Sequence, residues 1–195
     1  MRKVFGIGMF RTGTTSLGRC LDILGHRTLH GPWWPSPEMI RDPWLLRPEA
    51  WAAFDGVLQA KITAYDAFQD YPWMYAYRQA DAWFPGSRFI LTVRDPERVV
   101  DSEIRRWMKG DNPVPPRQKF RDRYLRHRDG VLEYFADRDD LLVLSFEAGD
   151  GWPQLCPFLE LPDPGVPIPH LNKGSDHIWL SKMGRRLKRW VRGED

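Results

Sequence analysis

The sequence has only two cysteines among its 195 residues, Cys20 and Cys156. They form no Cys-x-x-Cys pair, and no Cys/His spacing typical of a zinc site is present, so neither a disulfide-rich secreted domain nor a zinc domain is indicated. The chain also lacks a run of 18 apolar residues, the length that a membrane-spanning helix needs. Its first residues, MRKVFGIG, do not have the pattern of a signal peptide. We therefore expect a soluble cytoplasmic protein with buried, reduced thiols.

Net charge is low as well, at +3, which gives no reason to expect nucleic acid as a partner. The length predicts a single domain, residues 1–195, with a substantial core. Tryptophan and proline are abundant instead, and both concentrate in residues 31–54, which predicts a long loop. Four tryptophans of this loop are candidates to stack on a sugar, an aromatic or a lipid acceptor: Trp33, Trp34, Trp44 and Trp51. A small apolar subcore beneath the loop is the alternative.

Apolar runs alternate with helical patterns along the rest of the chain. Strands are expected at 3–8, 65–69, 88–93 and 141–146. Helices are expected at 14–25, 73–83, 95–109, from the prolines at 113–116 to about 136, 151–159, and from 175 onward. In the helix that begins at Asp95, the expected buried face is Val100, Ile104 and Trp107. The alternation predicts a three-layer α/β/α domain with a central parallel sheet, similar to P-loop NTPases.

A glycine-bearing loop, GIGMFRTGTTS at residues 6–16, joins the first strand to the first helix. Backbone amides of such a loop and the positive end of the helix form a phosphate site. The frame is almost the P-loop pattern G-x-x-x-x-G-K-[ST], but Thr14 replaces the lysine that holds the β- and γ-phosphates of ATP. The strand at 88–93 is followed by Arg94 rather than by a magnesium-binding aspartate. These differences predict a phosphate bound without a metal, with Arg11 as its charge partner; an ordinary tight turn is the alternative.

Arg94 and Ser102 form a second candidate anion site. Arg94 ends a buried strand, where ligands of open α/β sheets bind, and Ser102 lies two helical turns further on. A phosphate between them would accept bonds from the guanidinium and the hydroxyl. The alternative is that Arg94 pairs with Asp95 or Asp101.

These two motifs, in this order, resemble the sulfotransferase family, which uses 3′-phosphoadenosine 5′-phosphosulfate (PAPS). The family's 5′-phosphosulfate loop, [KR]-[TS]-G-T-T, matches Arg11, Thr12, Gly13, Thr14 and Thr15. Its 3′-phosphate site, an arginine ending a strand and a serine eight residues on, matches Arg94 and Ser102. Lys173-Gly174 is similar to the basic-glycine element that helps to hold the 3′-phosphate. The resemblance extends from about residue 3 to 174 and implies sulfuryl transfer from PAPS to a hydroxyl or an amine of a small molecule, sugar or lipid, with adenosine 3′,5′-bisphosphate as product and no required metal.

The sequence departs from the family at two positions of this loop. Many members have lysine where Arg11 stands, and a guanidinium stays protonated, so Arg11 would act by electrostatics and hydrogen bonding without giving up a proton. Ser16 stands where several members place an aromatic ring against adenine. We still expect Ser16 to be among the residues that bind PAPS. We expect Phe146 or a tryptophan of the 33–51 loop to supply that ring.

Asp70 is the candidate general base. Related enzymes place a histidine or a carboxylate just after a core strand and before a proline, and Asp70-Tyr71-Pro72 fills that position. The ordinary pKa of an aspartate, near 3.9, would have to be raised by burial for this role. The alternative is that Asp70 caps a helix beginning near Pro72. His26 and His30 are rival bases, and Lys61 is a candidate to hold the sulfuryl group.

The C-terminal stretch predicts a basic helix at about 175–192. Its apolar stripe is Trp179, Met183, Leu187 and Trp190. Docking of this stripe on the domain is favoured over peripheral contact with an anionic membrane. Two functions remain as alternatives to a sulfotransferase: a magnesium-dependent small-molecule kinase with a degenerate P-loop, and a nucleotide-binding module without activity. The sequence does not fix the oligomeric state.

Overall fold

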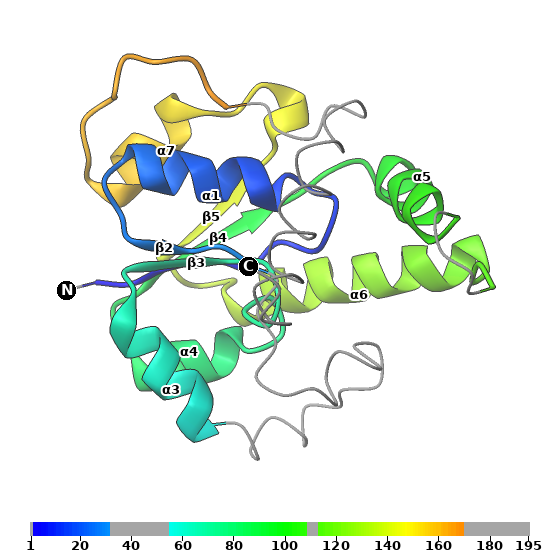
Figure 1. Cartoon of the computed structure of the whole chain (residues 1–195), viewed down its shortest axis with the longest axis horizontal. Coiled ribbons are helices and arrows are strands. Elements are labelled where there is room, and N and C mark those ends of the chain that lie inside the picture. The colour runs from blue at the N-terminus through cyan, green and yellow to red at the C-terminus, as the bar shows by residue number, and fades with distance from the viewer. Residues whose placement is uncertain (1, 32–54, 109–112, 170–195) are drawn as a thin grey trace, which may run out of the picture.

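The computed structural model describes residues 2–31, 55–108 and 113–169 (Figure 1). Lys173, the expected C-terminal helix and nearly all of the Trp/Pro-rich loop, from residue 32 to 54, lie outside the described residues. The elements in chain order are β1 Val4–Gly6, α1 Thr14–Ile23, β2 Thr28–Leu29, α3 Asp55–Ala64, β3 Ala67–Gln69, α4 Tyr77–Trp83, β4 Arg88–Thr92, α5 Pro96–Trp107, α6 Arg117–Tyr134, β5 Leu141–Leu144, the 3-10 turn η2 Phe146–Ala148, and α7 Trp152–Leu159.

Five parallel strands form one sheet in the order β2-β3-β1-β4-β5. Helices α1 and α7 cover one face of this sheet, while α3, α4 and α6 cover the other, and α5 packs on α6 beyond the strand ends (Figure 1). This arrangement confirms the predicted three-layer α/β/α fold with a parallel sheet. Within the described part of the chain, none of the helices combines the length and the apolar character that a membrane span requires.

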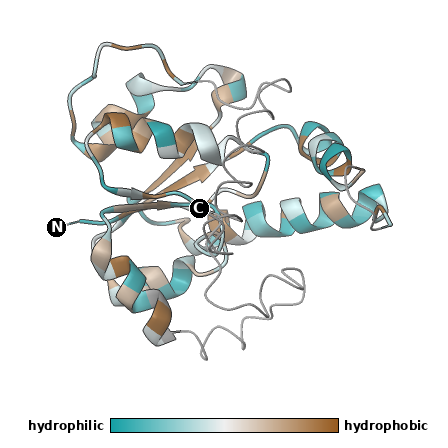
Figure 2. Cartoon of the chain, viewed as in Figure 1, coloured by the Kyte–Doolittle hydropathy of each residue, from teal (hydrophilic) through white to brown (hydrophobic). Residues whose placement is uncertain are grey.

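Strand side chains alternate between two apolar layers, as the period of two in a strand requires. Phe5 points into the layer under α3, α4 and α6, where its ring lies 4.9 Å from the ring of Phe68 and 5.5 Å from that of Phe89. Val4 and Ile90 point to the opposite layer, under α1 and α7. Because both faces of the sheet are covered, the strands consist mostly of hydrophobic residues, whereas the part of α6 that projects from the sheet is largely hydrophilic (Figure 2).

The strand order reverses at one position, next to β1. From β1 the chain first builds β2 and β3 on one side and then β4 and β5 on the other. In open α/β sheets such a reversal leaves a crevice at the carboxyl ends of the central strands, and ligands bind there. The segments that follow β1, β3 and β4 therefore meet at this edge, and they carry Arg11, Asp70 and Arg94.

Several predicted elements differ in detail from those observed. The strand β2 and the helix α3 were not predicted, and the helix expected at 73–83 begins only at Tyr77, after a series of turns. The strand expected at 141–146 ends at Leu144, because the Ser145 hydroxyl accepts a bond from the amide of Ala148 and starts a 3-10 turn. By contrast, the start of α5 is confirmed: Asp95 caps it by accepting a 3.0 Å bond from the amide of Arg98.

The buried face of α5 differs from the prediction. The structure buries Val99, Val100, Ser102 and Glu103, whereas Ile104 and Trp107 keep partial exposure. The reason is that α5 packs against α6 and faces the loop after β1, so polar side chains as well as valines turn inward.

Candidate active site

The loop after β1, residues 7–13, is the one in which the sequence predicts phosphate binding, and it is called the phosphate loop below. Gly8 crosses the end of β4 so closely that a Cβ on it would lie 1.8 Å from the Thr92 hydroxyl oxygen. Gly13 ends the loop with φ 107°, a left-handed conformation that favours glycine, and a Cβ there would lie 2.7 Å from the Phe146 ring. The two glycines therefore let the backbone pass between β4 and Phe146 before α1 begins.

Hydroxyl side chains fill the loop and the first turn of α1. Thr12 is buried, and its hydroxyl donates to the Met9 carbonyl at 2.5 Å and lies 2.6 Å from the Thr92 hydroxyl. These contacts of Thr12 stabilise the conformation of the loop and connect the loop to β4. Thr14 and Ser16 are also buried, while Thr15 keeps partial exposure.

Arg11 lies in the phosphate loop and has an uncommon backbone conformation, with φ 71°. Its Nε donates a 2.7 Å hydrogen bond to Oγ of Ser102 on α5. Of the described residues other than glycine, only Arg11, Asp70 and Glu160 have positive φ. Such conformations cost free energy, and they gather at functional sites.

Arg94 follows β4 and reaches the same loop. Its Nη1 donates to the backbone carbonyl of Arg11 at 3.5 Å, and its Nε donates to Oε1 of Glu147 at 3.4 Å. Both distances are long, so neither contact holds the guanidinium tightly. Glu147 also accepts from the amide of Asp95 at 3.2 Å and pairs with Arg98. The partner of Arg94 is thus Glu147 rather than either aspartate considered from the sequence.

In the structure, Ser102 is hydrogen-bonded to Arg11 and not to Arg94. The motif expected to bind the 5′ end and the motif expected to bind the 3′-phosphate are therefore joined by direct contacts at one site. A hydroxyl that accepts one bond still has a proton to donate, so Ser102 remains able to bind a ligand oxygen.

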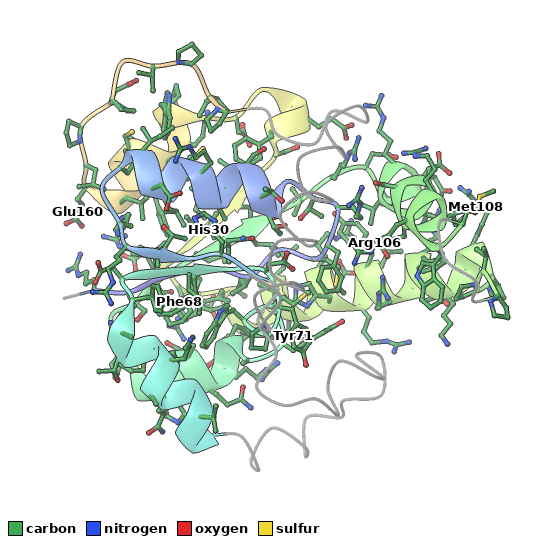
Figure 3. All side chains as sticks on the ribbon, in the orientation of Figure 1. His30, Phe68, Tyr71, Arg106, Met108 and Glu160 are labelled. Atoms are coloured by element: carbon green, nitrogen blue, oxygen red, sulfur yellow. The ribbon has the colours of Figure 1, made fainter. Side chains whose placement is uncertain are left out.

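Positive charge is concentrated around Arg11. Burial lowers the pKa of its guanidinium; the carboxylate of Glu103 opposes this, and the charges of Arg106, Arg94 and Arg105 lower the pKa further. Figure 3 labels Arg106, an exposed residue in the last turn of α5, on the side of that helix toward the strand ends. A guanidinium remains protonated in spite of such shifts, so the site suits a ligand with several negative charges.

Asp70 follows β3 with φ 71°, beside the cis peptide bond between Tyr71 and Pro72. Its Oδ1 accepts a 2.8 Å bond from the amide of Tyr71. Gly31 packs against it, since a Cβ on that glycine would lie 2.7 Å from the Asp70 Cβ. Burial raises the pKa of Asp70 from 3.8 to about 6; the Tyr71 amide and the charge of Arg106 oppose the rise, and the charge of Glu103 adds to it. The capping alternative does not apply, because no helix begins at Pro72.

Of the rival candidates, His30 follows β2 at the same edge of the sheet as Asp70, next to Gln69, whereas His26 and Lys61 lie farther away. His30 hydrogen-bonds through Nε2 to Asp22 on α1 at 2.9 Å, and its ring packs on the backbone of α1 at Gly18. His26 follows the C-terminus of α1, about 15 Å along that helix from the phosphate loop. Lys61, on α3, lies over the ring of Tyr65 ahead of β3, at the opposite edge of the sheet from the phosphate loop.

Three residues at the site were not found from the sequence. Glu103 is 2% exposed; its Oε2 lies 3.6 Å from Arg123, and its Oε1 is buried without a hydrogen-bond partner among the described residues. Its spacing of four residues from Val99 is the signal that would have placed it on the buried face. Tyr124 and His127 on α6 bond to the backbone of Arg94 and of Ile7, and no local pattern marks such contacts.

The fold and the phosphate loop together define a P-loop-like α/β domain. A family model described as the Sulfotransferase domain matches residues 3–103 and 97–177 of the chain. Because these matches cover most of its length, the chain belongs to the sulfotransferase family. A comparison with curated proteins gave no match. Among the described residues, no group of three or more His, Cys, Asp and Glu side chains is arranged to hold a metal ion.

Proposed function

We propose that this sulfotransferase moves a sulfuryl group from PAPS to a hydroxyl or an amine of a small-molecule, sugar or lipid acceptor, without a metal. The observation that carries the proposal is the junction of two anion-binding motifs. Arg11 bonds to Ser102 at 2.7 Å, and Arg94 reaches the carbonyl of Arg11 at 3.5 Å. One nucleotide with phosphates at both its 5′ and 3′ positions would contact both motifs.

The residues present fit such a donor. Gly13 is the N-cap of α1 and has no side chain that could accept a hydrogen bond from the first amides of the helix. Those amides can therefore donate to a bound anion. None of the four residues of that first turn, TTSL, is acidic. Thr14 stands where an ATP-binding loop has lysine, and β4 leads to Arg94 instead of a magnesium-binding aspartate. The ring of Phe146 lies over Gly13, beside the position proposed for the 5′ end.

Each residue then has a defined task. When bound, PAPS supplies the sulfuryl group and leaves as adenosine 3′,5′-bisphosphate. Arg11, the α1 amides and the hydroxyls of Thr14 and Thr15 hold the 5′ end and stabilise negative charge that develops there. Arg94 holds the 3′-phosphate. Asp70 accepts the acceptor's proton at Oδ2, because Oδ1 already accepts from the Tyr71 amide.

Calorimetric titration of the full chain tests the donor. In the presence of EDTA, adenosine 3′,5′-bisphosphate should bind at least about tenfold more tightly than adenosine 5′-monophosphate, since a charge-assisted phosphate contact contributes that much or more. Binding of Mg·ATP but not of the bisphosphate would overturn the proposal in favour of a kinase. If the protein binds the bisphosphate but transfers no sulfuryl group from PAPS to any member of a broad acceptor panel, it is a nucleotide-binding module without catalytic activity.

Arg94→Ala makes this test specific for the 3′ position. The variant should bind the bisphosphate and the monophosphate with nearly equal affinity, because the 3′-phosphate loses its partner. Arg98→Ala is the matched control, since Arg98 shares Glu147 with Arg94 and is more exposed, with 63% of its side chain accessible. A preference for the bisphosphate that survives in Arg94→Ala would remove Arg94 from the site.

A further inference from the structure

A single buried hydroxyl holds both backbone polar groups of Arg94. The Tyr124 hydroxyl donates to the Arg94 carbonyl at 2.7 Å and accepts from the Arg94 amide at 3.0 Å. Tyr124 lies on α6 and is 2% exposed. The preceding residue, Val93, still bonds to β5 through Leu144, so Arg94 is the first residue beyond the sheet's own ladder. Tyr124 therefore replaces the strand partner that Arg94 lacks.

The phenol is suited to this double contact at neutral pH. Burial raises the pKa of Tyr124, while the bond with Arg94 and the charge of Arg128 lower it. The net rise keeps the hydroxyl protonated, so it donates to the carbonyl and accepts from the amide at once. One turn further along α6, the Nε2 of His127 lies 2.8 Å from the carbonyl of Ile7, at the start of the phosphate loop. Helix α6 thus contacts the backbone at both halves of the donor site.

The side chain of Arg94 is held far less tightly than its backbone. Its two contacts, to Glu147 and to the carbonyl of Arg11, are 3.4 and 3.5 Å long. The direction in which the guanidinium leaves the chain therefore depends on the anchored backbone. A small displacement of that backbone would move the guanidinium away from a bound phosphate oxygen, and a bidentate contact tolerates little displacement.

We propose that Tyr124 is a positioning residue for phosphate recognition: by fixing the backbone of Arg94, it sets the preference of this site for a nucleotide with a 3′-phosphate. This inference rests on the proposed function, in which Arg94 binds that phosphate. It names the hydroxyl of Tyr124, which does not touch the ligand, as a determinant of donor specificity.

The test is Tyr124→Phe in the full chain, titrated with adenosine 3′,5′-bisphosphate and with adenosine 5′-monophosphate. Affinity for the bisphosphate should fall about tenfold, whereas affinity for the monophosphate should change less than about twofold. The ratio of the two affinities is the readout, because a general loss of structure would lower both. Tyr134→Phe is the matched control: it lies on the same helix and loses a 2.7 Å bond to Asp81, away from the site. Its ratio should equal that of the wild type.

The outcomes separate the two proposals. A wild-type chain with equal affinity for the two nucleotides would overturn the donor assignment and this inference with it. A wild-type preference that persists undiminished in Tyr124→Phe, or equal losses for both nucleotides, would overturn the role of Tyr124 alone. If the phenylalanine variant does not fold, Tyr124→Met removes the same hydroxyl with a more adaptable side chain, and the same ratio decides.

Discussion

The side chains of Arg11 and Ser102, 91 residues apart in the chain, are joined by a 2.7 Å hydrogen bond from Nε to Oγ. This bond connects the phosphate loop to α5. Because the serine hydroxyl accepts from the guanidinium, its own proton is directed elsewhere, and a ligand phosphate is a suitable acceptor for it. Ser102 thus orients Arg11 and offers one donor at the same site.

Ser102→Ala should weaken binding of adenosine 3′,5′-bisphosphate by about tenfold, because Arg11 loses its orienting partner and the ligand loses a donor. Calorimetric titration measures the change. Ser87→Ala is the matched control: that serine is also buried and donates a 2.7 Å bond, to the Phe84 carbonyl, far from the site. Binding in Ser102→Ala that equals binding in the control would show that the link to Arg11 has no part in recognition.

Asp70→Asn should abolish transfer and make the protein more stable. The asparagine keeps the Oδ1 acceptor for the Tyr71 amide and tolerates φ 71°, but it cannot accept the acceptor's proton. Folding raises the pKa of Asp70 from 3.8 to about 6, so the ionised carboxylate destabilises the folded state. This loss of stability is absent below pH 3.8, grows between pH 3.8 and pH 6, and reaches its full size above pH 6. Unfolding of the variant at pH 8 should therefore require up to about 3 kcal/mol more free energy than that of the wild type.

The difference in stability should fall to less than about 1 kcal/mol at pH 4, because the cost develops only as the pH rises from the unfolded pKa of 3.8 to the folded pKa of about 6. Urea unfolding at pH 4 and pH 8 measures both values, and titration with adenosine 3′,5′-bisphosphate should give an affinity close to that of the wild type. Undiminished turnover in the variant would exclude Asp70 as the base.

The pH dependence of kcat/KM should show an acid limb near pH 6, because Asp70 must be deprotonated to act as a base. Glu103 faces this carboxyl group from α5, and its negative charge raises the pKa of Asp70; Arg106 and Arg11 lower it. Glu103→Gln should therefore move the limb to lower pH, whatever its effect on maximal rate. Glu97→Gln, an exposed change on the same helix, should leave the limb in place. An unmoved limb in Glu103→Gln would contradict this electrostatic contact.

Local patterns predicted those parts of the fold that depend on local chemistry. Asp95-Pro96 correctly predicted the start of α5, and the apolar run before Arg94 correctly predicted a buried strand. Both features depend on residues that are neighbours in the sequence, so a local pattern is enough to predict them. The two-residue strand β2 leaves almost no pattern of its own, and its place is decided by pairing with β3. The position of the glycine-bearing loop between a strand and a helix was also predicted from the sequence, and the structure has it between β1 and α1.

The contacts that arrange the site were not recognisable in the same way. The bond between Arg11 and Ser102, and those from Tyr124 to the backbone of Arg94, join segments that the tertiary fold alone brings together. The raised pKa of Asp70 likewise arises from burial beneath Gly31 and beside α5, which no local pattern records. Residue types were therefore predictable from the sequence, whereas their partners were not.

Gly13→Ala should damage donor binding through the shape of the phosphate loop, and Gly86→Ala supplies the matched control. Both glycines have positive φ, 107° and 80°, so an alanine at either position should cost about 1–2 kcal/mol of stability. At Gly86 the new methyl group would meet nothing within 4 Å, but at Gly13 it would lie 2.7 Å from the Phe146 ring. The loop or that ring must then move, which adds about 1–3 kcal/mol. Adenosine 3′,5′-bisphosphate should bind Gly86→Ala normally and Gly13→Ala at least tenfold more weakly; equal binding by both variants would show that the close approach of loop and ring has no part in holding the nucleotide.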